Sequence, residues 1–230
     1  MEYTLQIGPI KNSSAVGLRL TKSWQGVQKK LEHYFAKDKQ RTLKIGLMGS
    51  HDTGKTTLGF TICGKLKTRH YNVDYVAEVA RHIPASLKVN EGTNFFAQYW
   101  ILNQQINEEI LAKLRGANMI VTDRTVVDNY AYAYRATSPQ VQQISEEDLK
   151  VMEAKCLHWV KTYDFLFYVA VPSKKMEDDG FRSTEKQFQL EIDTCIKQII
   201  KEWKLDVVSL EGTNDERIDM MLGTLFKQEF

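Results

Sequence analysis

The chain has 230 residues, of which 43% are hydrophobic and 26% are charged, so one domain can bury a sizeable core without crosslinks. The formal net charge is +2, which neither demands nor excludes an anionic ligand. The three cysteines are widely spaced and have no metal-ligand pattern, which argues against a disulfide framework and a zinc site. The sequence shows no signal peptide and no membrane span, so we expect a soluble, cytoplasmic protein without a membrane partner.

Strand-like and helix-like patterns alternate after residue 42, which predicts an α/β fold with a mostly parallel sheet. Strands are expected at residues 43–49, 72–78, 118–124, 164–171 and 205–210. Helices are expected at residues 55–69, 94–115, 145–160, 185–203 and 214–226. Asn94 is expected to cap the second of these helices, and Ser145 with Asp148 resembles a capping box at the third.

Residues 1–42 do not follow this alternation. A short strand at 3–7 and a helix at 23–36 are expected there, followed by a charged linker. We interpret residues 1–42 as an N-terminal extension packed on the core, and residues 43–230 as the main domain.

The segment from Gly49 to Thr56 has the pattern G-x-x-x-x-G-K-[ST] between a predicted strand and a predicted helix. Backbone N–H groups of such a P-loop and the helix N-terminus together bind phosphate. Lys55 is expected to reach the β- and γ-phosphates, and the Thr56 hydroxyl to hold Mg²⁺. The residues expected to bind the nucleoside triphosphate here are Gly49, Ser50, His51, Asp52, Thr53, Gly54, Lys55, Thr56 and Thr57. His51 and Asp52 occupy variable positions of the motif, where polar side chains usually face solvent or the second substrate. We assign neither a catalytic role, and for His51 we favour a solvated loop residue over a base.

P-loops serve GTPase switches, motor ATPases and kinases. A GTPase switch would need an N-K-x-D motif, which the chain lacks. A motor ATPase usually places a glutamate beside its magnesium-binding aspartate, but Asp123 stands between Thr122 and Arg124. Transfer of phosphate to an acceptor is therefore favoured over hydrolysis.

Charged residues follow two of the predicted strands, at the edge where parallel sheets bind ligands. Asp123 is expected to be the second magnesium anchor, near Thr56. Arg124 is expected to point toward the acceptor, with an ion pair to Asp128 as the alternative. Glu78 is expected to orient the acceptor hydroxyl or accept its proton. Arg81 is expected beside Glu78, either at the acceptor or in a surface salt bridge.

Three further segments are candidates for ligand contacts. The helix at 94–115 is rich in aromatic residues, which we interpret mostly as core, but Gln98 and Gln105 share one face and one of them is expected to contact the acceptor. Residues 173–187 are interpreted as a lid closing over the phosphates. Its cations are Lys174, Lys175 and Arg182, with Gly180 as a hinge, and a solvated loop is the alternative. Gly212 and Thr213 are expected to lie at the adenine edge.

Together, the P-loop, VAEVAR (residues 76–81), VTDR followed by DNYAYAY, and DDGFR resemble small P-loop kinases related to the nicotinamide-riboside kinase domain, of the AAA-type ATP-binding kinases. The resemblance to deoxynucleoside and thymidylate kinases is more distant. It implies a three-layer P-loop NTPase fold with a five-stranded parallel sheet in the order 2-3-1-4-5, ATP with Mg²⁺, and a nucleoside-like acceptor. It assigns residues 49–56 to phosphate, Asp123 to the metal, Glu78 to the acceptor and Arg182 to the lid.

The sequence therefore predicts an ATP-dependent phosphotransferase acting on a nucleoside-like small molecule. Two alternatives stay open. One is a kinase acting on a hydroxyl of nucleic acid or of a modified base in DNA, although the near-zero net charge offers no extended basic track. The other is a nucleotide-sensing module in which ATP only sets the conformation. The acceptor's identity and the oligomeric state are not predicted.

Overall fold

The computed structural model describes residues 42–171 and 186–226. The first half of this part contains β1 (Leu43–Met48), α2 (Lys55–Lys67), β2 (Val73–Val76), the 3-10 helices η1 (Val79–His82) and η2 (Asn90–Gly92), and α3 (Phe95–Leu114). The second half contains β3 (Met119–Asp123), α4 (Val126–Ala136), α5 (Glu146–Val160), β4 (Phe165–Val169), α6 (Lys186–Glu202), β5 (Val208–Leu210) and α7 (Asn214–Phe226). The strand and helix predicted within residues 1–41 lie outside the described residues, as does nearly all of the predicted lid.

The five strands form one parallel sheet in the order β2-β3-β1-β4-β5. This confirms the α/β fold and the strand order that the family resemblance implied. Leu47 of β1 lies opposite Asp123 of β3, and Val76 of β2 lies opposite Thr122. The P-loop, Asp123 and the residues just after β2 therefore meet at the carboxyl edge of the sheet, where open parallel sheets bind ligands.

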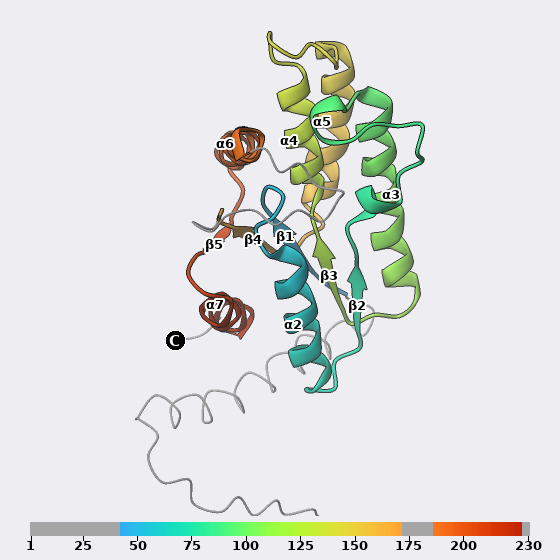
Figure 1. Cartoon of the computed structure of the whole chain (residues 1–230). Coiled ribbons are helices and arrows are strands. Elements are labelled where there is room, and N and C mark those ends of the chain that lie inside the picture. The colour runs from blue at the N-terminus through green and yellow to red at the C-terminus, as the bar shows by residue number, and fades with distance from the viewer. Residues whose placement is uncertain (1–41, 172–185, 227–230) are drawn as a thin grey trace, which may run out of the picture. The chain divides into compact units, whose positions relative to one another are not determined.

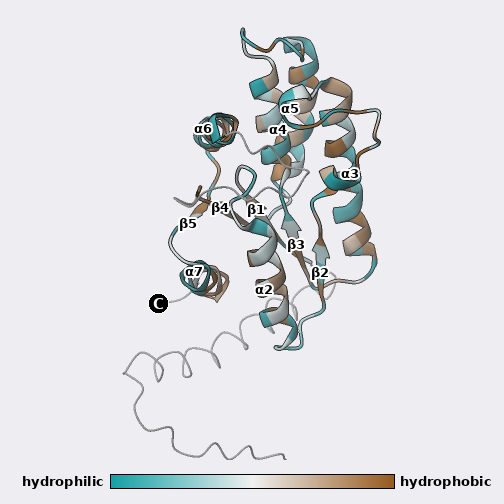
Figure 2. Ribbon diagram, viewed as in Figure 1, coloured by the Kyte–Doolittle hydropathy of each residue, from teal (hydrophilic) through white to brown (hydrophobic). Residues whose placement is uncertain are grey.

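Helices cover both faces of the sheet, giving three layers (Figure 1). In Figure 1, α3, α4 and α5 lie beside one another, away from α2 and α7. Consecutive residues of β1 point to opposite faces, as strand geometry requires. A side chain added at Gly59 of α2 would meet Leu47, whereas Met48 belongs to a buried cluster with residues of α3 to α6. Figure 2 shows hydrophilic and hydrophobic residues together on α3 and α7, as expected of helices that lie between a sheet and solvent.

Several predicted helix ends are confirmed by their capping contacts. Asn94 caps α3 by accepting a hydrogen bond from the backbone N–H of Ala97 at 3.0 Å. Ser145 caps α5 by accepting one from the N–H of Asp148 at 3.1 Å. No helix in the described part of the chain is long and apolar enough to cross a membrane.

Helix α4 is missing from the sequence prediction. Nine of its eleven residues are buried, including the polar Asp128 and Asn129, so burial along this helix does not follow the polarity of its residues. Its start is a complete capping box, in which Thr125 and Asp128 bond to each other's backbone N–H groups. The cap Thr125 therefore directly follows Arg124, and the helix begins two residues after Arg124 and three residues after Asp123.

Candidate active site

The P-loop (residues 49–56) joins β1 to α2 as the sequence predicts. Gly49 has φ of +152°, and a Cβ there would lie 2.7 Å from the carbonyl oxygen of Val169, so a larger residue would clash with β4. Gly54 has φ of +89° and immediately precedes α2, a conformation that glycine adopts without steric cost. The two glycines of the motif thus let the loop turn tightly against the sheet.

His51 is buried, contrary to the solvated position that we expected. Its exposed fraction is 1%, because its ring stacks on Phe188 of α6 at 5.5 Å between centroids. Its Nδ1 lies 3.2 Å from the hydroxyl of Tyr132 of α4. The expectation failed because these partners are more than 80 residues away in the sequence. Asp52, by contrast, is only partly buried.

Lys55 is folded back onto the P-loop. Its Nζ donates to the carbonyl of Ser50 at 2.5 Å and to Oγ1 of Thr53 at 3.1 Å. Burial lowers the pKa of Lys55 to about 8, and the Arg124 charge adds to this effect, while Asp128, Asp123 and Glu78 oppose it. A buried ammonium held only by neutral oxygens is suited to exchange them for phosphate oxygens.

Thr56 and Asp123 are brought together at the start of α2. The Thr56 hydroxyl donates to Oδ2 of Asp123 at 2.6 Å, and the Tyr75 hydroxyl donates to the same oxygen at 3.1 Å. A hydroxyl and a carboxylate are oxygen ligands of the kind that Mg²⁺ prefers. The two residues predicted from sequence to hold the metal therefore lie side by side and fit a magnesium ion.

Glu78 and Arg124 form a buried ion pair beside the P-loop. Nε of Arg124 lies 2.5 Å from Oε1 of Glu78, and the Glu78 side chain is only 3% exposed. Burial opposes charging of Arg124, but the Glu78 carboxylate more than compensates, so the pKa of Arg124 is raised well above its usual value. Arg81 follows in η1 and bonds the other oxygen of Glu78 at 2.9 Å, so the salt bridge considered from the sequence is present.

Asp128 is not the ion-pair partner of Arg124 that the sequence left open. Its carboxylate accepts hydrogen bonds from the backbone N–H of Gly49 at 2.8 Å and from the N–H and hydroxyl of Thr125, both at 2.8 Å. Burial raises the pKa of Asp128, against the lowering effects of Arg124 and Lys55. Asp128 thus ties the start of α4 to the start of the P-loop, a role that the sequence analysis missed.

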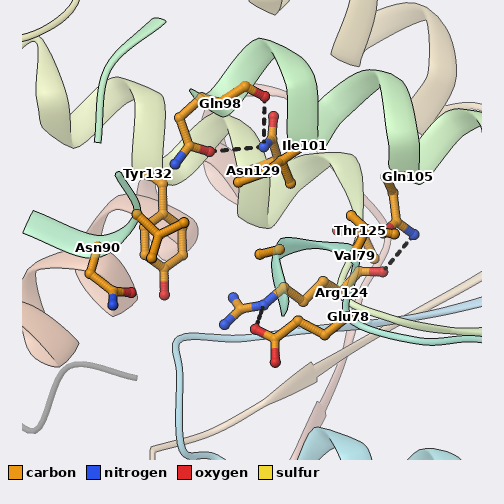
Figure 3. A pocket seen from close by; sticks show the side chains of 12 residues that line it. Glu78, Val79, Asn90, Gln98, Ile101, Gln105, Arg124, Thr125, Asn129 and Tyr132 are labelled. Atoms are coloured by element: carbon orange, nitrogen blue, oxygen red, sulfur yellow. Dashed lines mark hydrogen bonds and ion pairs between the residues drawn. The ribbon is translucent and has the colours of Figure 1, made fainter. Parts of the chain in front are cut away.

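A cavity lies next to the Glu78–Arg124 pair (Figure 3). Gln98 and Gln105 of α3 both line it, so they lie on one face of the helix. Nε2 of Gln105 lies 3.4 Å from the carbonyl of Arg124 and 2.8 Å from Oε1 of Glu109. The other lining residues are Glu78, Val79, Ala80, Val89, Asn90, Ile101, Arg124, Thr125, Asn129 and Tyr132.

Asn129 is a site residue that the sequence analysis missed. Its Nδ2 donates to the side-chain oxygen of Gln98 at 2.8 Å and to the Gln98 carbonyl at 3.1 Å (Figure 3). Its Oδ1 is buried and has no hydrogen-bond partner within the described ranges, and the same holds for Nη1 of Arg124. Leaving buried polar atoms unbonded is costly, and both residues line the cavity, so these two atoms are candidates for bonds to a ligand.

Helix α7 supports the P-loop from the other side. Arg217 donates to the carbonyl of Thr53 at 3.0 Å and to that of Ala170 at 3.2 Å. Gly212 and Thr213 lead into this helix, where the Glu216 carboxylate accepts from the N–H and hydroxyl of Thr213. These residues do not line the cavity beside Glu78, and no sequence motif indicated Arg217.

The structure thus gathers Lys55, Thr56, Glu78, Asp123 and Arg124 at one edge of the sheet. Of the remaining predicted site residues, Thr57 is exposed on α2, and the side chain of Arg81, which bonds Glu78, is 37% exposed. The predicted lid cations Lys174, Lys175 and Arg182, and the hinge Gly180, lie outside the described residues.

Comparison with known proteins identifies the family. Residues 44–217 match the model of the AAA domain family, whereas no curated protein matches the chain. Among solved structures, a deoxyadenosine kinase from M. mycoides with bound dATP has a TM-score of 0.59 at 14% identity, covering 80% of this chain and 98% of its own. The NadR protein in complex with NAD and AMP-PNP has a TM-score of 0.64 at 17% identity, covering 94% of this chain, although the match spans only 58% of NadR.

A third solved structure is similar over most of both chains. The thymidylate kinase of Candida albicans has a TM-score of 0.55 at 17% identity, covering 81% of this chain and 92% of its own. At these identities the similarity concerns the fold. The chain therefore belongs to the AAA domain family, and its fold is that of the small P-loop nucleoside and nucleotide kinases.

Proposed function

We propose that the protein is an ATP-dependent phosphotransferase that moves the γ-phosphate of ATP to a hydroxyl of a nucleoside-like small molecule. The observation that carries the proposal is that Lys55, the Thr56–Asp123 pair and the Glu78–Arg124 pair meet at one edge of the sheet, next to a cavity. Phosphoryl transfer needs cations and a positioned acceptor hydroxyl more than covalent chemistry. This edge supplies the cations, and the Glu78 carboxylate could position the hydroxyl of the acceptor. The dATP and AMP-PNP bound in the similar structures support a nucleotide ligand.

In this proposal, residues 49–57 bind the triphosphate. Lys55 leaves the Ser50 carbonyl for the β- and γ-phosphates, where its charge offsets the charge that develops during transfer. Thr56 and Asp123 would hold Mg²⁺, which neutralises phosphate charge and orients the triphosphate.

The cavity beside Glu78, which we call the acceptor cavity, would hold the nucleoside-like molecule. Glu78 orients its hydroxyl or accepts the hydroxyl proton, while Arg124 attracts the transferring phosphoryl group through its unbonded Nη1. Gln98, Gln105 and Asn129 offer amide groups to the base, since an amide carries both a donor and an acceptor. Gly212 and Thr213 are proposed to meet the adenine of ATP, and Arg182 to close over its phosphates.

The decisive experiment measures ADP release from Mg-ATP in the presence of separate acceptors. The panel contains deoxyadenosine, thymidine, nicotinamide riboside, the corresponding monophosphates and an oligonucleotide with hydroxymethyl bases. Stimulation by a nucleoside supports the proposal. Stimulation by the oligonucleotide alone would instead identify a nucleic-acid kinase, and tight ATP binding without acceptor-stimulated release would identify a nucleotide sensor.

A further inference from the structure

Tyr132 lies between the P-loop and the acceptor cavity. Its ring lines the cavity (Figure 3), with the guanidinium carbon of Arg124 5.3 Å from the ring centre. Its hydroxyl lies within hydrogen-bond distance of Nδ1 of His51, 3.2 Å away. One buried side chain therefore contacts both candidate ligand sites.

His51 is fixed in the P-loop by contacts that the phosphate-binding motif does not require. Its ring stacks on Phe188, and Nε2 of Gln189 donates to its carbonyl at 2.7 Å. Phe188 also packs edge-on against Tyr132, with ring centroids 5.9 Å apart. A displacement of the loop at His51 must therefore be accommodated by Tyr132 or by α6, because packed interiors have little free space.

The contact that a triphosphate would replace lies immediately before His51. Lys55 donates to the carbonyl of Ser50, which belongs to the peptide that joins Ser50 to His51. Phosphate oxygens form stronger, charge-assisted hydrogen bonds with an ammonium than a neutral carbonyl does. Binding of a triphosphate thus removes a partner from the peptide that carries His51.

We propose that His51 is a positioning residue that acts through Tyr132, so that the triphosphate and the acceptor each strengthen binding of the other. The inference rests on the proposed function, since it places the acceptor in the cavity lined by Tyr132. Such coupling is reciprocal, because the two ligands bias the same arrangement of side chains. The sequence does not signal this role, as His51 occupies a position where the motif allows any residue.

The first test measures the dissociation constant of Mg-AMP-PNP by calorimetry, with and without a saturating acceptor. The acceptor probe is whichever of deoxyadenosine, thymidine and nicotinamide riboside gives the fastest ADP release. In the wild-type protein the acceptor should tighten Mg-AMP-PNP binding about 5-fold or more. The ratio of the dissociation constant without acceptor to that with acceptor should fall close to one in His51→Ala and in Tyr132→Phe.

Two variants serve as matched controls. His51→Asn should keep most of the ratio, because its amide can occupy the place of Nδ1 beside the Tyr132 hydroxyl. Tyr134→Phe should keep all of it, because this tyrosine lies on the same helix but its hydroxyl accepts from Gln198 of α6 at 3.0 Å instead. The proposal is overturned if the wild-type ratio is one, or if the ratio is unchanged in both His51→Ala and Tyr132→Phe. An equal loss of the ratio in Tyr134→Phe would also overturn it.

A second test needs no acceptor. Tyrosines are replaced by 3-fluorotyrosine, and the fluorine NMR signals of positions 132 and 134 are assigned with the two Tyr→Phe variants. Mg-AMP-PNP should shift the Tyr132 signal, and His51→Ala should reduce this shift at least about twofold. An unmoved Tyr132 signal with normal ADP release overturns the coupling alone, whereas a moved signal without ADP release overturns the proposed function alone.

Discussion

Two buried ion pairs lie at opposite ends of the strands, one at the amino edge and one at the carboxyl edge of the sheet. Lys44 in β1 bonds Glu109 of α3 at 2.6 Å, and Arg124 after β3 bonds Glu78 at 2.5 Å. The carboxylate of Glu109 accepts from Lys44, Trp159, Tyr163 and Gln105, so protein groups satisfy both of its oxygens. The Glu78–Arg124 pair instead borders a cavity and leaves Nη1 of Arg124 unbonded within the described residues.

The comparison separates two uses of a buried charge. A carboxylate whose oxygens are all satisfied by protein donors offers no bond to a ligand, and the strength of its ion pair says nothing about chemistry. A pair that keeps one donor free at a cavity can bind a ligand. Burial lowers the pKa of Lys44 although Glu109 opposes the shift, so perturbed ionisation alone does not distinguish the two edges.

Loss of Lys55 should have the largest effect at the carboxyl edge. We expect Lys55→Met to reduce ADP release by about 10³–10⁵-fold, the range for removing a cation that stabilises a transferring phosphoryl group. The melting temperature should be retained or raised at pH 7, since burial disfavours the ammonium in the folded protein. Normal turnover in this variant would show that the P-loop is not where the reaction occurs.

Glu78→Gln tests the reactive role of the pair at the cavity. Turnover should fall by about 10²–10⁴-fold, the usual contribution of an acid or base group. The dissociation constant of Mg-ATP should stay nearly unchanged, because Glu78 faces the acceptor. Asp74→Asn is the matched control, since Asp74 forms a more exposed ion pair with Arg115, and it should change neither quantity. Equal losses of turnover and ATP affinity in Glu78→Gln would mark Glu78 as structural.

Glu109→Gln should show the opposite pattern. Unfolding in denaturant should reveal a loss of about 3–5 kcal/mol, because the Lys44 ammonium would remain buried without an opposing charge. Turnover per folded molecule should remain near normal. The double variant Lys44→Met/Glu109→Leu should recover most of the stability, since it removes both charges. A stable Glu109→Gln protein with low turnover would show that the Lys44–Glu109 pair is not purely structural, contrary to the comparison.

The smallest expected effect is the pH dependence of ATP affinity. The pKa of Lys55 is lowered to about 8 by burial, so the ammonium is present below this pH and is lost as the pH rises above it. Affinity for Mg-ATP should therefore be flat below about pH 8 and fall by up to tenfold per pH unit above it. Calorimetry in buffers of different ionisation enthalpy should detect proton uptake on binding at pH 9. Lys55→Arg should abolish this dependence, because a guanidinium stays charged.

Local sequence patterns predicted most of the fold. Strand β1, the P-loop and α2 follow one another within 25 residues, so one short motif was enough to predict this part of the fold. The predicted strands at 72–78 and 205–210 were longer than β2 (Val73–Val76) and β5 (Val208–Leu210). Glu78 already starts the turn into η1, and Leu205 still bonds the carbonyl of Ile200 at the end of α6.

The cavity could be predicted only in part. Glu78, Asp123 and Arg124 follow strands, and parallel topology brings strand ends together, which is why their meeting was predictable. Asn129 and Tyr132 lie on α4, which was not predicted, and their partners Gln98 and His51 are distant in the sequence. Arg124 has φ of +84°, an unusual backbone conformation for a residue other than glycine. No pattern in the sequence predicts it.

The bond from Arg217 to the Thr53 carbonyl joins residues 164 positions apart. A growing chain therefore has the complete phosphate-binding motif long before it has the arginine that braces it. During synthesis, the glycines and Lys55 emerge first, and the bond from Arg217 to the loop forms only after the closing helix has docked. A nascent chain that stops before residue 217 would carry an intact nucleotide signature and an unsupported nucleotide site.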